Sequence, residues 1–133
     1  MKIFLDTNIF LDLLFKRELY KEALEIIDGV GYGRWRGYIL DITVLNIDYV
    51  AKKQMKNIQE FIQLLSATFT IVGADNAIID EALALENSDF EDSVQVIVAK
   101  NLACDVIVTN DKDFVQNSEI EVLSSKQFLE KYC

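Results

Sequence analysis

In the sequence KIFLDTN at residues 2–8, a short apolar run ends abruptly at an aspartate. Residues 2–5 have the length and apolar character of a buried strand, and Asp6 follows them directly. The same order recurs at residues 106–114, where the apolar run VIV is followed by TNDKDF. In open parallel α/β sheets, ligands bind beyond the carboxyl ends of the strands. These two runs therefore predict an α/β fold with polar side chains gathered at one edge of its sheet.

Between these two runs, strand and helix patterns alternate along the chain. Further strands are predicted at residues 38–40, 68–72 and 119–123. Helices are predicted around residues 9–14, at 18–28, from about Thr43, at 58–65 and 76–85, from a cap at Asp89 to about Ala103, and at 124–132. The glycine-rich segment at residues 29–33 is interpreted as the clearest break. The alternation predicts a central parallel sheet of four to five strands with helices on both faces.

Length and composition limit what the chain can be. Its 133 residues fit one domain spanning residues 1–133. Hydrophobic residues make up 51% of the chain, and the mean hydropathy of +0.16 favours a folded core over disorder. Histidine is absent, which excludes Ser-His-Asp and Cys-His nucleophile systems and histidine-bearing zinc sites. Because the net charge is −9, a nucleic-acid substrate would need a local basic patch or bound cations.

Signals for secretion or membrane insertion are absent from the sequence. The apolar run at residues 3–15 is interrupted by Asp6, Asn8 and Asp12, and it lacks the basic start and the cleavage site of a signal peptide. No stretch approaches the roughly 20 apolar residues that a membrane span needs. We therefore expect a cytoplasmic protein that does not contact a membrane.

Three aspartates occupy the positions where such a sheet carries its chemistry. Asp6 follows the first strand and Asp111 follows the fourth, so the two face one another if those strands are neighbours. Asp92 lies near the start of the late helix, and the residues four, seven and eleven positions later are apolar, which turns its carboxylate inward. Carboxylates clustered without basic residues repel one another unless a cation intervenes. The pattern predicts a magnesium or manganese site that acts on phosphate esters.

Each of these aspartates also has an ordinary structural explanation. Asp6 fits a cap on the helix that follows it, and Asp89 and Asp92 fit a capping pair at the start of the late helix. Asp111 and Asp113 fit a turn. Independent capping and turn formation do not, however, predict carboxylates at the ends of two adjacent strands and on the inward face of the connecting helix. Both interpretations stay open at the level of sequence.

Three stretches of the chain resemble the PIN-domain family of metal-dependent nucleases, which includes VapC-like toxins of toxin–antitoxin pairs. They are FLDTN at residues 4–8, DFED at 89–92 and VIVTNDKDF at 106–114. Their order and spacing are similar to those of a whole PIN domain over nearly the full chain. The resemblance implies a three-layer α/β/α sandwich with strand order 3-2-1-4-5. It also implies cleavage of RNA with one or two magnesium or manganese ions, and an antitoxin protein as a partner.

The resemblance assigns metal-binding and catalytic roles to individual acidic residues. By position, Asp6, Asp92 and Asp111 are similar to three of the four core acidic residues of the family. Asp89 and Asp113 are accessory candidates for the same metal site.

The remaining positions of the family pattern are polar. Thr7, Asn8 and Thr109 resemble the residues that orient the metal ligands. The fourth acidic position, usually a glutamate on the helix after the second strand, holds Asn46. An amide oxygen ligates a metal without negative charge, so we expect weaker metal affinity or the loss of one of two metal positions.

Basic residues concentrate in one segment despite the acidic total. They are interleaved with aromatic residues, a composition that suits single-stranded RNA through phosphate contacts and base stacking. These basic residues are Arg34, Arg36, Lys52, Lys53 and Lys56. The segment equally fits a solvated helix end and a loop whose Trp35 covers the core. Apolar residues of the first two helices either belong to the core or form a surface for an antitoxin or a second copy of the chain.

The leading hypothesis is a metal-dependent endoribonuclease that acts as the toxin of a toxin–antitoxin pair. An alternative is a PIN-like domain with weakened catalysis that binds RNA or protein, since Asn46 replaces the usual glutamate. A third hypothesis is a phosphotransfer enzyme that forms an aspartyl phosphate, because Asp6 and Asn8 are similar in spacing to the opening motif of haloacid-dehalogenase-type phosphatases. That motif has an aspartate where Asn8 stands in this chain.

Overall fold

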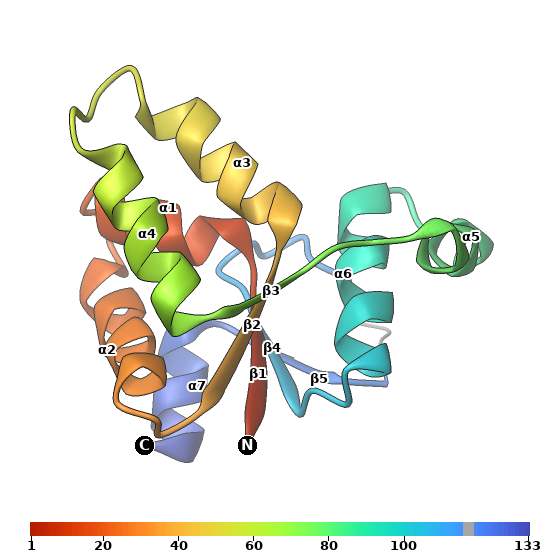
Figure 1. The fold of residues 1–133 in the computed structure, drawn as a ribbon. Coiled ribbons are helices and arrows are strands. Elements are labelled where there is room, and N and C mark those ends of the chain that lie inside the picture. Colours follow the sequence, from red (N-terminus) through yellow and green to blue (C-terminus); the bar gives the residue numbers. More distant parts are fainter. Residues whose placement is uncertain (116–118) are drawn as a thin grey trace.

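A five-stranded parallel sheet forms the centre of the molecule (Figure 1). The computed structural model describes residues 1–115 and 119–133. The strand order β3-β2-β1-β4-β5 is the predicted order. The strands are β1 (Lys2–Leu5), β2 (Arg36–Leu40), β3 (Thr70–Val72), β4 (Val106–Val108) and β5 (Glu121–Leu123). The first and fourth strands pair directly, with Leu5 opposite Val108, so their carboxyl ends meet at one edge of the sheet.

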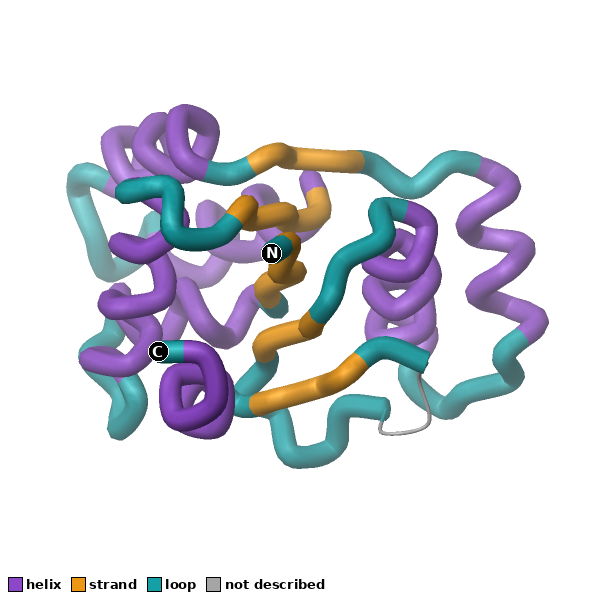
Figure 2. The backbone as a smooth tube through the Cα atoms, turned by 90° about the horizontal axis from the view of Figure 1, so that it is seen from below, coloured by secondary structure: helices purple, strands orange, loops and turns teal. Residues whose placement is uncertain are grey.

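Helices cover both faces of this sheet, as Figures 1 and 2 show, and the predicted three-layer sandwich is confirmed. One face carries α1 (Thr7–Leu14), α2 (Tyr20–Gly31), α3 (Asp41–Ala51), α4 (Ile58–Thr68) and α7 (Ser125–Tyr132). The other face carries α6 (Phe90–Asn101), with α5 (Asn76–Ala84) packed against it. No helix among the described residues combines the length and the apolar character needed to cross a membrane.

Alternation along the strands builds two separate cores. In β1, Ile3 and Leu5 face the core under α1 and α2, whereas Phe4 faces the core under α6. Helix α6 is buried at every position from residue 92 to residue 99. Because α6 is held on several sides, polar residues in this stretch are enclosed by the fold.

The prediction of a break at residues 29–33 is wrong in part, because α2 continues to Gly31. A Cβ atom at Gly29 would lie 2.2 Å from Cζ3 of Trp35, so the glycine makes room for the indole ring instead of ending the helix. The chain turns at Gly33, whose φ of +80° is a conformation that glycine adopts readily. Trp35 itself is buried and covers the core, as one of the two interpretations of this segment predicted.

The other elements differ from the predictions only at their ends. Strand β2 begins at Arg36, two residues earlier than predicted, and α3 begins at Asp41, directly after β2. Strand β3 begins at Thr70 because α4 extends to Thr68. Since α1 and α3 both start where a strand ends, their first turns lie at the same edge of the sheet as the ends of β1 and β4.

Candidate functional site

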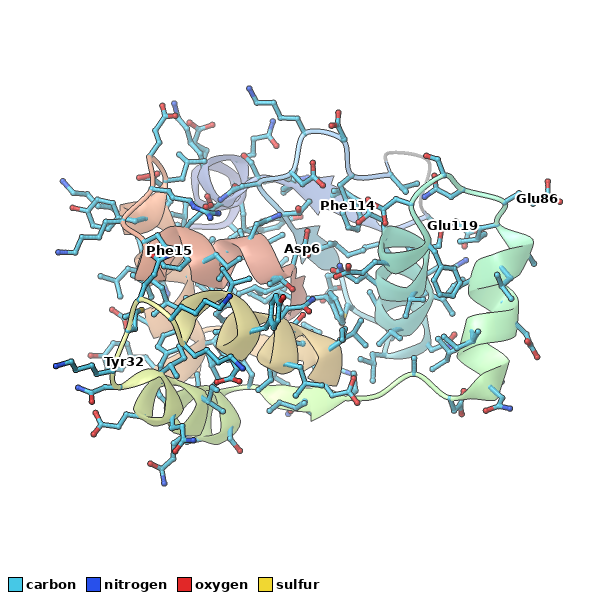
Figure 3. All side chains as sticks on the ribbon, turned by 90° about the horizontal axis from the view of Figure 1, so that it is seen from above. Asp6, Phe15, Tyr32, Glu86, Phe114 and Glu119 are labelled. Carbon is cyan, nitrogen blue, oxygen red and sulfur yellow. The ribbon has the colours of Figure 1, made fainter. Side chains whose placement is uncertain are left out.

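Asp6 is the centre of the site, at the junction of β1 and α1 (Figure 3). Its backbone N–H donates to the carbonyl of Val108 at 3.0 Å, which continues the pairing of β1 with β4 beyond the end of the strand. The side chain is 7% exposed and caps α1 by accepting from the backbone of Thr7 at 2.7 Å. The capping explanation is therefore correct for Asp6, and it describes only one of the hydrogen bonds that this carboxylate accepts.

Three further side chains donate to the Asp6 carboxylate. They are Gln95, whose Nε2 is 3.0 Å from Oδ1, and Asn8 and Thr109, whose Nδ2 and Oγ1 are 3.0 and 2.8 Å from Oδ2. Four donors on two oxygens hold the carboxylate in one orientation. The donors come from α1, α6 and the end of β4, so the fold as a whole fixes the position of Asp6.

Two of the three predicted supporting residues contact Asp6 with their side chains. The Asn8 amide bridges Asp6 and Thr109, and Thr109 Oγ1 also accepts from the backbone N–H of Asp111 at 3.1 Å. Thr109 thereby joins the ends of β1 and β4. The hydroxyl of Thr7 instead lies 3.0 Å from the hydroxyl of Thr43, so it connects α1 to α3.

Asp92 points inward from the first turn of α6, as predicted. It is 5% exposed, and its Oδ2 has no hydrogen-bond partner among the described residues. Burial, followed by the negative charges of Asp89, Asp6, Asp111 and Glu91, raises the pKa of Asp92 from 3.8 to about 7. A buried carboxylate oxygen without a donor is costly, and a proton or a cation removes that cost.

Glu91 belongs to the same group of charges and was missed in the sequence. Burial raises its pKa, and the charges of Asp6 and Asp89 raise it further. Adjacent helix residues point about 100° apart, so an inward Asp92 gave no reason to include Glu91. We call Asp6, Asp89, Glu91, Asp92 and Asp111 the acidic cluster. Each charge that acts on the Glu91 and Asp92 carboxyls belongs to this cluster.

The chemistry of the acidic cluster fits a divalent cation. It offers only carboxylate oxygens, which magnesium and manganese prefer, and the unpartnered Oδ2 of Asp92 lies among like charges. Across residues 1–115 and 119–133, however, no three acidic or cysteine side chains are already arranged to hold one ion. Asp111 is the exposed member of the cluster, and its Oδ1 accepts from the backbone N–H of Asp113 at 2.9 Å.

The two accessory candidates have the structural roles that capping and turn formation predict. Asp89 is the N-cap of α6 and accepts from the backbone N–H of Asp92 at 3.1 Å. Asp113 is exposed, and its backbone closes the turn onto Asp111. Asp89 nevertheless contributes its charge to the acidic cluster.

Asn46 lies on α3, three residues after Thr43, and is half-buried. Residues three apart share a helix face, and Thr43 contacts Thr7 in the first turn of α1. Asn46 is thus placed on the face of α3 that looks toward the turn capped by Asp6.

The five basic residues singled out in the sequence are not brought beside the acidic cluster. Arg36 pairs with Lys2 at the start of β1, four residues and about 13 Å from Asp6 at 3.3 Å per residue. The Arg34 guanidinium lies 4.6 Å from the Trp35 ring centroid and donates to Cys133 Sγ at 3.1 Å. The lysines at 52, 53 and 56 follow the far end of α3, about 16 Å from its first turn at 1.5 Å per residue.

Asn110 organises a second polar network that sequence reasoning missed. Its Nδ2 donates to Asp12 Oδ2 at 2.7 Å, and its backbone N–H donates to Asn8 Oδ1 at 3.0 Å. Its Oδ1 accepts from the backbone and the hydroxyl of Ser125 at 2.9 and 3.0 Å. The loop after β4 is therefore fixed to α1 and α7. The signal available in the sequence was Asp12, a charged residue inside the apolar pattern of the first helix.

Comparison with known proteins agrees with this architecture. The family profile described as PIN domain matches residues 2–113. Ribonuclease VapC1 of Aquifex aeolicus (strain VF5) is 26% identical over 98% of this chain and 95% of its own length. A toxin–antitoxin complex from Klebsiella pneumoniae has a TM-score of 0.71 at 20% identity, over 92% of this chain and 97% of the solved one. VapBC-1 of nontypeable Haemophilus influenzae has a TM-score of 0.69 at 18% identity, over 95% and 99%.

Proposed function

This chain belongs to the PIN domain family, and we propose that it is a metal-dependent endoribonuclease that acts in the cytoplasm as the toxin of a toxin–antitoxin pair. The observation that carries the proposal is the acidic cluster, with one buried carboxylate oxygen that has no donor. The relative named as a ribonuclease supports RNA as the substrate. The structural neighbours described as toxin–antitoxin complexes support an antitoxin as the partner.

We assign the metal to Asp6, Asp92 and Asp111, with Asp89 and Asp113 as accessory groups and Asn46 at the fourth position. A bound magnesium or manganese ion supplies positive charge against the phosphodiester and lowers the pKa of water. Asp6 is held in place by its four donors, whereas Asp111 is exposed and one of its oxygens accepts from the backbone of Asp113. The chain therefore provides one carboxylate fixed by hydrogen bonds and one exposed carboxylate, and the charges of both act on Asp92.

Asp92 controls the charge of the site. With its pKa at about 7, the carboxyl is about half protonated at neutral pH while no cation is present. Loss of this proton leaves a carboxylate oxygen without a donor, which a cation can then contact. Thr109 and Asn8 hold the neighbouring Asp6 in place during this change, because both contact its Oδ2.

Cleavage of single-stranded RNA tests the proposal. The wild type should cleave the RNA with manganese and not with a chelator, and Asp92→Asn should be inactive with manganese. Asp80→Asn is the matched control, because it makes the same chemical change on an exposed position of α5. Equal cleavage with manganese, with chelator and by Asp92→Asn would contradict the proposal.

A binding module is the second candidate, and two observations favour it. Asn46 removes one charge from the family pattern, and the described carboxylates are not arranged in advance to hold an ion. Such a module would bind RNA without cleaving it at any manganese concentration. The cleavage assay and an RNA-binding assay on the same preparation separate the two functions.

A further inference from the structure

We propose that a cavity beside the acidic cluster binds the RNA phosphate next to the one that is cleaved, through Lys112 and Lys126. The cavity has a volume of about 500 Å³, and we call it the lysine pocket. This inference rests on the proposed ribonuclease function, because it places a second part of the same RNA strand.

The lysine pocket is continuous with the acidic cluster. Its wall includes Thr109, which donates to Asp6, and Asp111, which is itself a member of the cluster. On the other side it is lined by Ser124, Lys126 and Gln127 at the start of α7. An RNA strand with one phosphate at the acidic cluster therefore enters the pocket directly when it leaves the cluster past Asp111.

The two walls of the pocket are fixed relative to one another. Asn110, which also lines it, accepts from the backbone and the hydroxyl of Ser125 at 2.9 and 3.0 Å. Ser124 and Gln127 cap α7 reciprocally, with hydrogen bonds of 2.9 and 3.1 Å. A preformed pocket costs little ordering when a ligand enters, which favours binding.

Two basic side chains, Lys112 and Lys126, line the pocket together with the carboxylate of Asp111. Lys112 and Lys126 are exposed, and neither takes part in an ion pair with another described residue. Two ammonium groups without an ion pair to another described residue, Lys112 in the loop after β4 and Lys126 in the first turn of α7, favour an anion in the pocket.

An RNA phosphate fits this pocket better than a base does. The lysines are point charges that contact phosphate. The polar side chains of Asn110, Ser124 and Gln127, which also line the pocket, already make hydrogen bonds within the fold instead of being free to read a base edge. We therefore expect the contact to be independent of RNA sequence. An acidic segment of a protein partner is the competing occupant, and it predicts that neutralising Lys112 and Lys126 leaves RNA affinity and its salt dependence unchanged.

The test compares two double variants that each remove two positive charges. Lys112→Gln/Lys126→Gln alters the pocket, and Lys52→Gln/Lys53→Gln alters exposed lysines after α3. Each is made in the Asp92→Asn background, so that labelled single-stranded RNA of two unrelated sequences stays intact. The dissociation constant is measured by fluorescence anisotropy at several salt concentrations.

We expect the pocket variant to bind both RNAs more weakly, with a salt-dependence slope smaller by about 1.4, since each lost contact with a single strand removes about 0.7. With equal binding of the two proteins at 1 M salt, this change in slope corresponds to a dissociation constant about 25-fold higher at 0.1 M salt. The variant altered after α3 should bind as the background protein does.

The inference and the proposed function fail in different ways. If the wild type cleaves RNA but the pocket variant keeps the affinity and salt slope of the background, the pocket does not bind the strand. A larger loss in the Lys52→Gln/Lys53→Gln variant would also overturn the inference, because the strand would then follow α3. If the wild type cleaves no RNA with manganese, the proposed function fails, whatever the binding data show.

Discussion

At the scale of single residues, the ionised form of Asp92 that can bind a metal is also the form that destabilises the metal-free fold. Its pKa is 3.8 in the absence of perturbation and about 7 in the fold, so between these values the folded state binds a proton that the unfolded state has lost. This residue therefore contributes most to stability below pH 3.8. The contribution is lost as the pH rises toward 7.

The first prediction follows from that sign. Asp92→Asn should raise the melting temperature of the metal-free protein at pH 8, where it removes a buried charge, and should raise it less at pH 5, where the folded wild type keeps this carboxyl protonated and only part of its stabilisation is lost. Thermal unfolding in a chelator at both pH values measures this, with Asp80→Asn as the exposed control. The same change in melting temperature at both pH values would show that the Asp92 charge is not the cause.

Gln95 is a positioning residue for Asp6. It is 1% exposed, its Nε2 donates to Asp6, and its Oε1 has no partner among the described residues. Gln95→Met should weaken manganese binding by about 10- to 100-fold, the usual effect of removing a group that orients a ligand. Calorimetry measures it, and Gln63→Met on the exposed side of α4 is the control. A lower melting temperature with unchanged manganese affinity would leave Gln95 only a packing role.

Asn46 decides how much negative charge the metal site carries. Asn46→Glu should increase manganese affinity about tenfold, because cation affinity rises with the number of charged ligands. Asn76→Glu at the exposed start of α5 makes the same change far from the acidic cluster. If the two variants bind manganese equally well in calorimetry, Asn46 lies outside the metal site.

At the scale of elements, the two glycines of α2 differ in whether the fold has room for a Cβ atom. A Cβ at Gly29 would lie 2.2 Å from the Trp35 ring, whereas one at Gly31 has Thr68 Cγ2 as its nearest neighbour at 3.9 Å. Gly29→Ala should therefore lower the free energy of unfolding by about 1–3 kcal/mol through overpacking. Gly31→Ala should raise it by up to about 1 kcal/mol through helix propensity. Urea unfolding measures both, and equal stability of the two variants would contradict this account.

Hydrophobic periodicity along the chain predicts where helices and strands lie better than it predicts the residues at which they begin and end. The short strands and the apolar faces of the helices follow from local periodicity, so their order was predicted. Glycine at position 29 was misread as a break because its reason is a contact with Trp35, which local sequence does not contain. In the same way, Thr70 opens β3 only because α4 runs on to Thr68.

At the scale of the whole molecule, the topology brings the carboxylates together. Asp6 and Asp111 were predicted to meet if the first and fourth strands are neighbours, an order that the family resemblance implied, and β1 does pair with β4 where the strand order reverses. Gln95 and Asn110 could not be placed in the same way, since their partners are 89 and 98 residues away in the chain. The fold also separates residues that are close in the chain: Arg36 lies beside the start of β1, away from the lysines that follow α3.

The acidic cluster is tested most directly by a calorimetric titration of manganese at pH 8 into the wild type, Asp92→Asn and Asp80→Asn. At this pH the Asp92 carboxyl is mostly ionised, because its pKa is about 7. We predict saturable binding to the wild type and to Asp80→Asn, and none to Asp92→Asn. No saturable binding to the wild type, or equal binding to all three proteins, would contradict the assignment of the metal to this cluster.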